Sequence, residues 1–240
     1  MTRVLVQLRA ELLLLARNGE QLLLTLVIPV VLLAFFGAVD ILPTGDVESI
    51  DFLVPGIIAV AIMSTSMVSL GIATGFERSY QVLKRLGATP LTRGELVVAK
   101  ILTVFVVEVV QIAVLLPIGY AQGWRPNGST VALAIVAVLL GTAAFAGLGL
   151  ILAGSLRAEI NLAAQNGLYL VLLLLGGMII SQNSLPGPMA DVSAALPSSA
   201  LADFLRSSLN GDGPLLPPAV VLAIWAVLTP LIAARRFRWS

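Results

Sequence analysis

Six long runs of apolar residues constrain the fold of this chain more than any other feature. They cover residues 22–39, 52–76, 96–120, 131–153, 160–181 and 215–234. Each run has at least 18 residues, which as a helix rising about 1.5 Å per residue nearly crosses a hydrocarbon core of about 30 Å. The composition agrees, because 58% of the residues are hydrophobic and only 11% are charged. We therefore expect lipid to surround much of the chain.

The fold class follows from what a backbone can do in lipid. Backbone N–H and C=O groups find no partner there, so spanning segments are helices or closed barrels. The six runs lack the polar and apolar alternation of a barrel strand. The sequence predicts an all-α integral membrane protein with six transmembrane helices, in which residues 1–240 form a single transmembrane domain.

The basic residues predict how the spans are oriented. Only Arg125 and Arg206 of the 14 fall on one side of the six-span arrangement. The other twelve are Arg3, Arg9, Arg17, Arg78, Lys84, Arg85, Arg93, Lys100, Arg157, Arg235, Arg236 and Arg238. Because cytoplasmic loops are enriched in Lys and Arg, we expect a multi-pass protein of the cell membrane with both termini in the cytoplasm.

The N-terminal segment has its own periodicity. Leu5, Leu8, Leu12 and Leu15 recur at helical spacing before the first span. This pattern predicts an amphipathic helix over residues 1–20 that lies in the cytoplasmic membrane interface.

The segment between the fifth and sixth spans, residues 182–214, is too short and too polar to cross the membrane. It contains an apolar stretch, residues 200–209, before which Ser198 or Ser199 could cap a helix. We expect short helices that pack over the external ends of the spans.

The longest cytoplasmic connection joins the second and third spans over residues 77–94 and carries five charged residues. Three apolar and two basic side chains can share a short helix there, which a Gly and a Thr-Pro pair would end. These residues are Val82, Leu83, Leu86, Lys84, Arg85, Gly87, Thr89 and Pro90. A helix of this kind suits the docking of a soluble partner, although its basic residues alone would also suit a topology determinant near lipid headgroups.

Glu108 stands near the middle of the third span, and Gln111 follows about one turn later. An ionised carboxylate is costly in lipid, so Glu108 should face the bundle interior or a cavity. Both residues are candidates for a translocation path, and Glu108 for a protonatable site. The alternative is that Glu108 is a neutral, hydrogen-bonded packing residue.

Several classes of function are excluded by composition. The chain has no Cys and no His, which removes disulfides, thiolate metal sites and imidazole proton shuttles. We expect no metal site and no catalytic residue. The formal net charge of +1 gives no bias toward nucleic acid, and none is expected as a partner.

The connection between the second and third spans resembles the cytoplasmic loop of type-2 ABC exporter permeases, the six-span subunits of drug, polysaccharide and lipid exporters. The matching residues are Glu77, Arg78, Leu83, Leu86, Thr89, Pro90, Leu91, Glu95 and Lys100. A Gly that the family usually has soon after its acidic-basic pair is replaced here within residues 79–81. A second resemblance, to the family's external Leu-Pro, Pro and Asp-x-x-Arg series, rests on Pro186, Pro197, Asp203 and Arg206.

The resemblance implies partners. It implies two permease subunits, as a homodimer or heterodimer, bound to two cytoplasmic ABC ATPase subunits. The implied ATPase-coupling loop consists of Glu77, Arg78, Leu83, Lys84, Arg85, Leu86, Thr89, Pro90, Leu91 and Arg93. The phosphate-binding pattern G-x-x-x-x-G-K-[ST] is absent from the sequence. We therefore expect ATP and Mg²⁺ on the partner ATPase, no cofactor on this chain, and no enzymatic activity of its own.

The leading hypothesis is the permease subunit of an ATP-driven exporter that moves a hydrophobic or amphipathic drug or lipid, as in multidrug efflux, by alternating access. One alternative is a proton-coupled secondary carrier centred on Glu108, although no inverted repeat is evident. An intramembrane enzyme is less favoured, because paired carboxylates at membrane depth are lacking. An assembly subunit without transport of its own stays open.

Overall fold

The computed structural model describes residues 2–17, 19–39, 49–126, 130–179, 186–211 and 213–236, and the regular structure within these ranges is entirely helical. The helices are α1 (Thr2–Arg17), α2 (Gly19–Ala38), α3 (Ser49–Met63), the π-helical segment η1 (Ser64–Ser69), α4 (Leu70–Ser79), α5 (Val82–Gly87), α6 (Arg93–Ala121), α7 (Val131–Ser155), α8 (Ala158–Leu175), α9 (Gly187–Ala194), α10 (Pro197–Asn210) and α11 (Leu216–Arg236).

Five helices within the described ranges are long and apolar enough to cross a membrane. They are Ile50–Ser79, in which α3, η1 and α4 are continuous, then α6, α7, α8 and Leu216–Arg235 of α11. The expected first span corresponds to α2, whose apolar part among the described residues, Thr25–Ala38, is shorter. The all-helical fold is therefore confirmed, whereas the sixth span and the single domain over residues 1–240 stay predictions.

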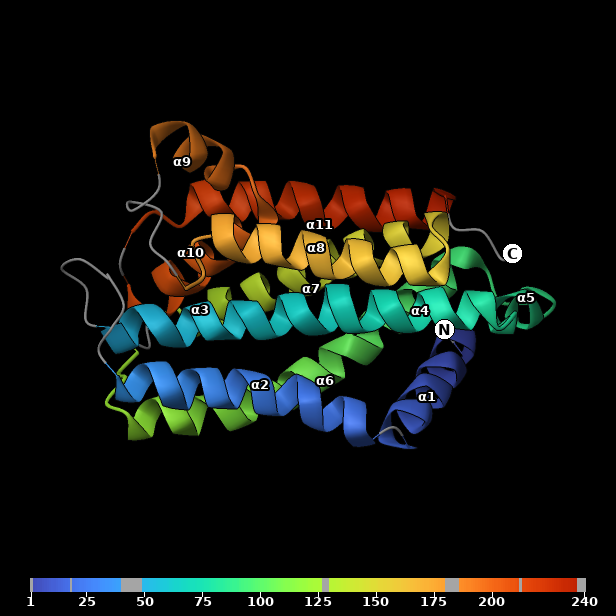
Figure 1. The fold of residues 1–240 in the computed structure, drawn as a ribbon, viewed down its shortest axis with the longest axis horizontal. Coiled ribbons are helices and arrows are strands. Elements are labelled where there is room, and N and C mark those ends of the chain that lie inside the picture. The colour runs from blue at the N-terminus through green and yellow to red at the C-terminus, as the bar shows by residue number, and fades with distance from the viewer. Residues whose placement is uncertain are drawn as a thin grey trace.

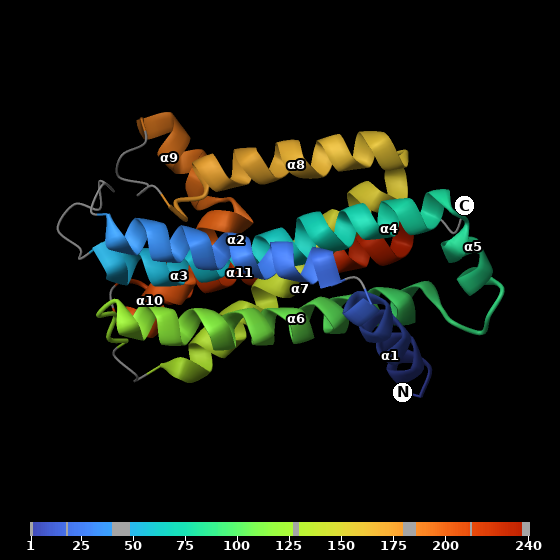
Figure 2. The ribbon, with the colours of Figure 1, turned by 60° about the horizontal axis from the view of Figure 1, so that its bottom comes forward.

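The long helices run side by side along one axis (Figure 1, Figure 2). Helix α7 packs most extensively against α11 and also contacts α3, α4, α6, α8 and α10, which places it inside the bundle. Helix α1 crosses one end of the bundle obliquely, and α5 and the end of α11 lie at that same end (Figure 1). Helices α9 and α10 lie at the opposite end.

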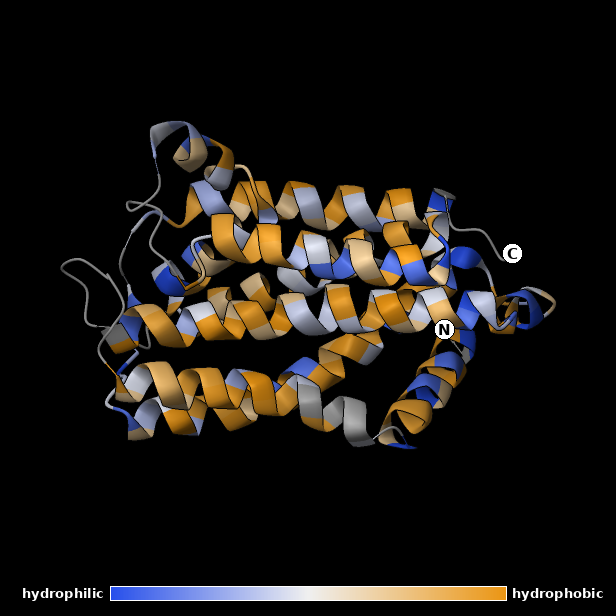
Figure 3. Cartoon of the chain, viewed as in Figure 1, coloured by the Kyte–Doolittle hydropathy of each residue, from blue (hydrophilic) through white to orange (hydrophobic). Residues whose placement is uncertain are grey.

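Apolar side chains cover the outside of the bundle as well as its core. On α6, Val98, Leu102, Val106 and Val109 are all exposed. Figure 3 shows hydrophobic residues along the length of the helices and hydrophilic residues concentrated toward the ends. An exposed apolar surface of this extent is unfavourable in water and suits a lipid environment.

The π-helical segment η1 interrupts the second expected span. Its wider turn brings the backbone of Met67 close to α7, where a Cβ atom added at Gly149 would lie 2.6 Å from the Met67 carbonyl oxygen. Only glycine therefore allows this approach. Apolar periodicity does not reveal a single wide turn, so the sequence analysis did not predict η1.

Two expectations at the opposite end of the bundle are corrected. Helix α8 ends at Leu175, before the predicted end at residue 181, because the chain turns at Gly177 with a φ of 60°. Residues 180–185 lie outside the described ranges. The expected cap at Ser198 or Ser199 is wrong, since both serines are buried within the first turn of α10.

Proline rather than serine begins α10. Leu196 is the N-cap residue and makes no side-chain capping bond, and Pro197 stands at the first helical position, where its fixed φ suits a helix start. Helix α10 packs against α3, α7 and α11 and buries ten of its residues. It is therefore inserted into the end of the bundle rather than laid over it.

Candidate functional site at the α4 to α6 end

The connection from α4 to α6 is an ordered hairpin. Gln81 turns the chain between α4 and α5 with a φ of 61°, and α5 then runs for six residues. The Thr89 hydroxyl donates a hydrogen bond of 2.6 Å to the Leu86 carbonyl and closes the turn after α5. The segment predicted to couple to an ATPase therefore contains a short helix that is followed by a hydrogen-bonded turn.

Helix α6 begins with a capping box. The Glu95 N–H donates to the Thr92 hydroxyl at 3.2 Å, and the Thr92 N–H donates to the Glu95 carboxylate at 2.8 Å. Just before it, the Pro90 carbonyl accepts a 2.8 Å hydrogen bond from Nη1 of Arg3. The hairpin is thus tied to the first turn of α1.

The apolar face expected on α5 is divided between inside and outside. Leu83 is fully buried, and Leu86 and Leu91 pack partly buried beside it. They join a cluster from α4, α6, α7 and α11 whose buried members are Leu70, Leu96, Val97, Val104, Ala146, Leu150 and Ala233. Val82 instead remains 38% exposed. Leu83 therefore anchors α5 to the bundle and cannot itself contact a partner.

The outward surface of α5 and of the turn before it includes Tyr80 in the turn and Val82, Lys84 and Arg85 on the helix, all of them exposed. Tyr80 is the most open of the four, with 71% of its surface accessible. Two apolar and two basic side chains thus form what we call the outer face of α5. Arg93, also exposed, follows at the start of α6.

Glu77 and Arg78, adjacent in sequence, bind different helices. Nη1 of Arg78 donates to the carbonyls of Ala153 at 3.1 Å and Leu156 at 3.3 Å, where α7 ends. A cation is favourable at a helix C-terminus, where carbonyls lack intrahelical partners. Arg78 therefore joins α4 to the end of α7.

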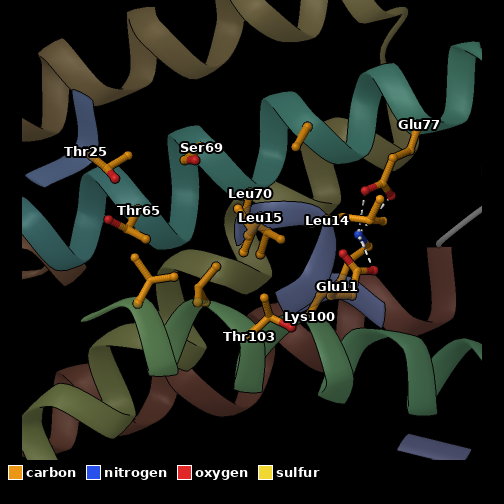
Figure 4. A pocket seen from close by; sticks show the side chains of 13 residues that line it. Glu11, Leu14, Leu15, Thr25, Thr65, Ser69, Leu70, Glu77, Lys100 and Thr103 are labelled. Carbon is orange, nitrogen blue, oxygen red and sulfur yellow. Dashed lines mark hydrogen bonds and ion pairs between the residues drawn. The ribbon is translucent and has the colours of Figure 1, made fainter. Parts of the chain in front are cut away.

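Glu77 shares a buried lysine with α1. The ammonium of Lys100, on α6, lies 2.8 Å from Oε2 and 3.1 Å from Oε1 of Glu77, and 3.0 Å from Oε1 of Glu11. The Lys100 side chain is only 1% exposed. Figure 4 shows the ammonium between the two carboxylates. We call these three residues the Lys100 triad; it joins α1, α4 and α6 near the hairpin.

The candidate path residues Glu108 and Gln111 lie deeper in the bundle, and both are buried. Glu108 hydrogen-bonds with the Thr142 hydroxyl of α7 through Oε2, while its Oε1 has no hydrogen-bond partner. Gln111 accepts a 3.1 Å hydrogen bond from Thr65 of η1 and donates one of 2.7 Å to the Thr25 carbonyl of α2. Both side chains therefore join helices in the interior, where Glu108 was expected, and their part in a translocation path stays a prediction.

The external motif residues lie at the other end of the bundle. Pro186 is the N-cap residue of α9, and Pro197 begins α10. Nη2 of Arg206 donates to the Met178 carbonyl at 2.9 Å, and its guanidinium lies 3.6 Å from the centroid of the Phe52 ring. Asp203 pairs with Arg206 at 3.3 Å. These contacts hold α10 against α3 and the chain that follows α8.

Arg206 remains charged in this buried position. Burial lowers the pKa of Arg206 to about 10, and the carboxylate of Asp203 opposes that decrease. The pKa is still well above neutral.

Within the described part of the chain, His, Cys, Asp and Glu form no group of three that could hold a metal ion.

The family model of ABC-2 type transporters matches residues 2–210. This chain belongs to the ABC-2 type transporter family. No curated protein matches it in a sequence comparison. The match extends from α1 through α10 and so includes the hairpin, the Lys100 triad and the external motif.

Membership of the ABC-2 family implies that this permease associates with an ABC ATPase. In this permease, the coupling-loop residues named from the sequence lie around one end of the bundle. Glu108 and Gln111 lie in its interior. Pro186, Pro197, Asp203 and Arg206 are at the far end, away from that loop. The predicted roles of all these residues stay predictions.

Sequence reasoning missed Glu11 in this ABC-2 permease. Glu11 lies in the segment predicted to be an amphipathic helix, but it is only 8% exposed and is bound to Lys100. Gln7 also donates to Glu11, at 2.9 Å. The available signal was an acidic residue beside a leucine stripe, together with a Lys near the start of the third expected span.

Proposed function

We propose that this chain is the membrane permease subunit of an ATP-driven ABC exporter. It would move a hydrophobic or amphipathic substrate, a drug or a lipid, out of the cytoplasm or the inner leaflet by alternating access. A second permease subunit and cytoplasmic ATPase subunits would complete the transporter. In the proposed arrangement the protein lies in the cell membrane with six spans, and both termini are cytoplasmic together with α5.

The observation that carries the proposal is that α5 packs one side against the bundle and exposes the other. Its inner residue, Leu83, is packed among side chains from α4, α6, α7 and α11. Its outer face offers Val82, Lys84 and Arg85 to a partner. A displacement of α5 by an ATPase would therefore move four helices together, since packed interiors transmit strain rather than absorb it.

The test is co-purification of the ATPase with the permease from native membranes. We expect Val82→Asp, on the outer face of α5, to reduce the recovered ATPase activity about tenfold, as the loss of a central contact does in interfaces. The matched control is Val192→Asp on α9, where the side chain is 55% exposed at the opposite end. It should leave recovery unchanged. Equal recovery with both variants, or no ATPase with the wild type, would contradict the proposal.

ATP and Mg²⁺ would bind the partner subunit in this arrangement, and this chain would bind no cofactor of its own. Hydrolysis would be lost with the partner and would not persist in the purified permease. A purified chain that hydrolyses ATP would overturn this part of the proposal.

A second candidate function, a proton-coupled secondary carrier, is favoured by Glu108, whose fully buried carboxyl has one oxygen without a hydrogen-bond partner. Such groups in membrane spans often serve proton transfer. Proteoliposomes that contain the chain alone discriminate between the two functions. Uptake driven by a proton gradient and abolished by Glu108→Gln supports the carrier, whereas transport that requires the ATPase and ATP supports the exporter.

A further inference from the structure

Two adjoining spaces open beside α1. A cavity of about 170 Å³ lies between α1, η1, α4 and α6, and the Lys100 triad forms part of its wall (Figure 4). A groove of about 270 Å³ runs beside it between α1, α2 and α6. Leu15, Thr25 and Val107 line both spaces. The cavity and the groove therefore adjoin at these three residues.

The two spaces differ in chemistry. Three charged residues line the cavity, Glu11, Glu77 and Lys100, and their formal charges leave one negative charge in excess. The lining of the groove is almost wholly apolar, and besides the shared residues it consists of Leu12, Ala16, Leu26, Val106, Val110 and Gln111. The two adjoining spaces thus offer a negative end and an apolar groove.

The negative end retains capacity for a cation. Two carboxylates can accept about eight hydrogen bonds between them, whereas one ammonium donates three. Lys100 pairs with both Glu11 and Glu77, and it is the one basic residue among the described residues that line the cavity. Attraction between charges is stronger where water is partly excluded, so a cation gains more here than at the surface.

We propose that this site binds a single-chain cationic amphiphile, with its ammonium group in the cavity beside Glu11 and Glu77 and its alkyl chain along the groove between α1 and α6. The two volumes together fall in the range of roughly 300 to 1,000 Å³ that is typical of small-molecule pockets, which neither space reaches alone. The proposal rests on the proposed export function and names its substrate class. An anionic headgroup would be repelled by the excess negative charge. A zwitterionic headgroup that contains a phosphate would be repelled in part.

Because the sequence contains no cysteine, a single introduced cysteine can report whether the site is occupied. Leu15→Cys places one thiol where the cavity and the groove meet, and the purified full-length chain in lipid nanodiscs is treated with N-ethylmaleimide. The matched control is Leu13→Cys, on the same helix and 53% exposed. The probes are decyltrimethylammonium, decanol, decanoate and decylphosphocholine, which share a ten-carbon chain. No ATPase is needed, so a negative result leaves the ATPase-docking test unaffected.

We expect decyltrimethylammonium to slow alkylation of Leu15→Cys about tenfold at roughly ten times its Kd, because occupied sites are protected in proportion to binding. The other three probes should protect at least tenfold less at the same concentration, and Leu13→Cys should react at one rate throughout. Absence of protection, or equal protection by the cation and decanol, would overturn the proposal. Equal protection by decylphosphocholine would overturn it in favour of a zwitterionic lipid headgroup.

A second variant tests the charge. Glu77→Gln in the Leu15→Cys background removes the excess negative charge while the Glu11 and Lys100 pair remains. We expect its affinity for decyltrimethylammonium to fall about tenfold, with no change in protection by decanol. Unchanged protection by decanol shows that the groove is intact in this variant. An unchanged affinity for the cation would refute the assignment of the headgroup to the triad.

Discussion

The ammonium of Lys100 lies 3.0 Å from the Glu11 carboxylate, and this ion pair joins α1, outside the bundle, to α6 within it. Glu77 contacts the same ammonium from α4. Side chains from three distant parts of the sequence therefore meet at one buried charge. Since a buried charge is tolerated only with partners around it, the position of α1 depends on this lysine.

Lys100→Met tests that dependence. The change leaves the carboxylates of Glu11 and Glu77 facing each other without a cation, which in buried pairs costs about 3–5 kcal/mol. We expect the low end, about 3 kcal/mol, because the Glu77 side chain is 24% exposed and can be hydrated. Denaturant titration in mixed micelles measures the loss in free energy of unfolding.

The control for Lys100→Met is the triple variant in which Glu11→Gln and Glu77→Gln accompany it. Removal of all three charges should restore at least about 1 kcal/mol, because uncompensated charge and not lost packing causes most of the damage. A triple variant no more stable than Lys100→Met would show instead that the lysine acts through its packing.

Gln81 stands where the chain requires a left-handed conformation. It is the one non-glycine residue with positive φ in the described part of the chain. An L-residue with a Cβ atom loses roughly 1–2 kcal/mol in this region, and glycine does not, although glycine is more costly to order. We expect Gln81→Gly to stabilise the protein by about 0.5–1 kcal/mol, measured as a higher thermal midpoint. Gln81→Ala keeps the Cβ atom and should change the midpoint little; an equal rise with both variants would argue against backbone strain.

Much of the fold could be predicted because apolar patterning acts locally. The runs that begin near residues 52, 96, 131, 160 and 215 all correspond to helices long and apolar enough to cross a membrane, and the leucine spacing of residues 5–15 lies within α1. In each case the signal lies within a few residues of the feature.

The rest depends on contacts between distant segments. A helix as short as α5 has too few turns for periodicity to tell which side faces inward, so Leu83 was expected on a docking face and is buried. The pairing of Glu11 with Lys100 requires knowledge of how α1 crosses α6, which neither segment encodes alone. For the same reason Glu108 could be placed in the interior, but its partner Thr142 could not be named.

Glu108 should tolerate replacement by its neutral analogue. The Thr142 hydroxyl lies within hydrogen-bonding distance of both Glu108 and the Val138 carbonyl, at 2.7 Å from the latter, yet it has one hydrogen to donate. A partner at position 108 that can donate as well as accept would satisfy both contacts. Glutamine provides both, so Glu108→Gln should change the free energy of unfolding by less than about 1 kcal/mol.

The comparison for Glu108 is Thr142→Val, which removes the hydroxyl and leaves a buried carboxyl without its partner. A loss of about 1–3 kcal/mol is expected from such an unsatisfied group. If Glu108→Gln proved as destabilising as Thr142→Val in the same titration, Glu108 would be required as a charged group and the interpretation as a neutral packing residue would fail.

Arg206 should be replaceable by no other cation. Besides its pair with Asp203, its planar guanidinium makes a 2.9 Å bond to the Met178 carbonyl, a 3.4 Å bond to the Phe52 carbonyl and a stack over the Phe52 ring. Lysine keeps the charge but not the fork or the plane. We expect Arg206→Lys to cost about 2 kcal/mol, measured by denaturant titration.

Asp203→Asn shows whether the charge pair or the shape of Arg206 holds α10 in place. The Asp203 side chain is 41% exposed and 3.3 Å from Arg206, so this pair should contribute less than about 1 kcal/mol. We therefore expect Arg206→Lys to be clearly less stable than Asp203→Asn. The reverse ordering would mean that α10 is held by the ion pair, and the carbonyls of Phe52 and Met178 would then be incidental neighbours of the guanidinium.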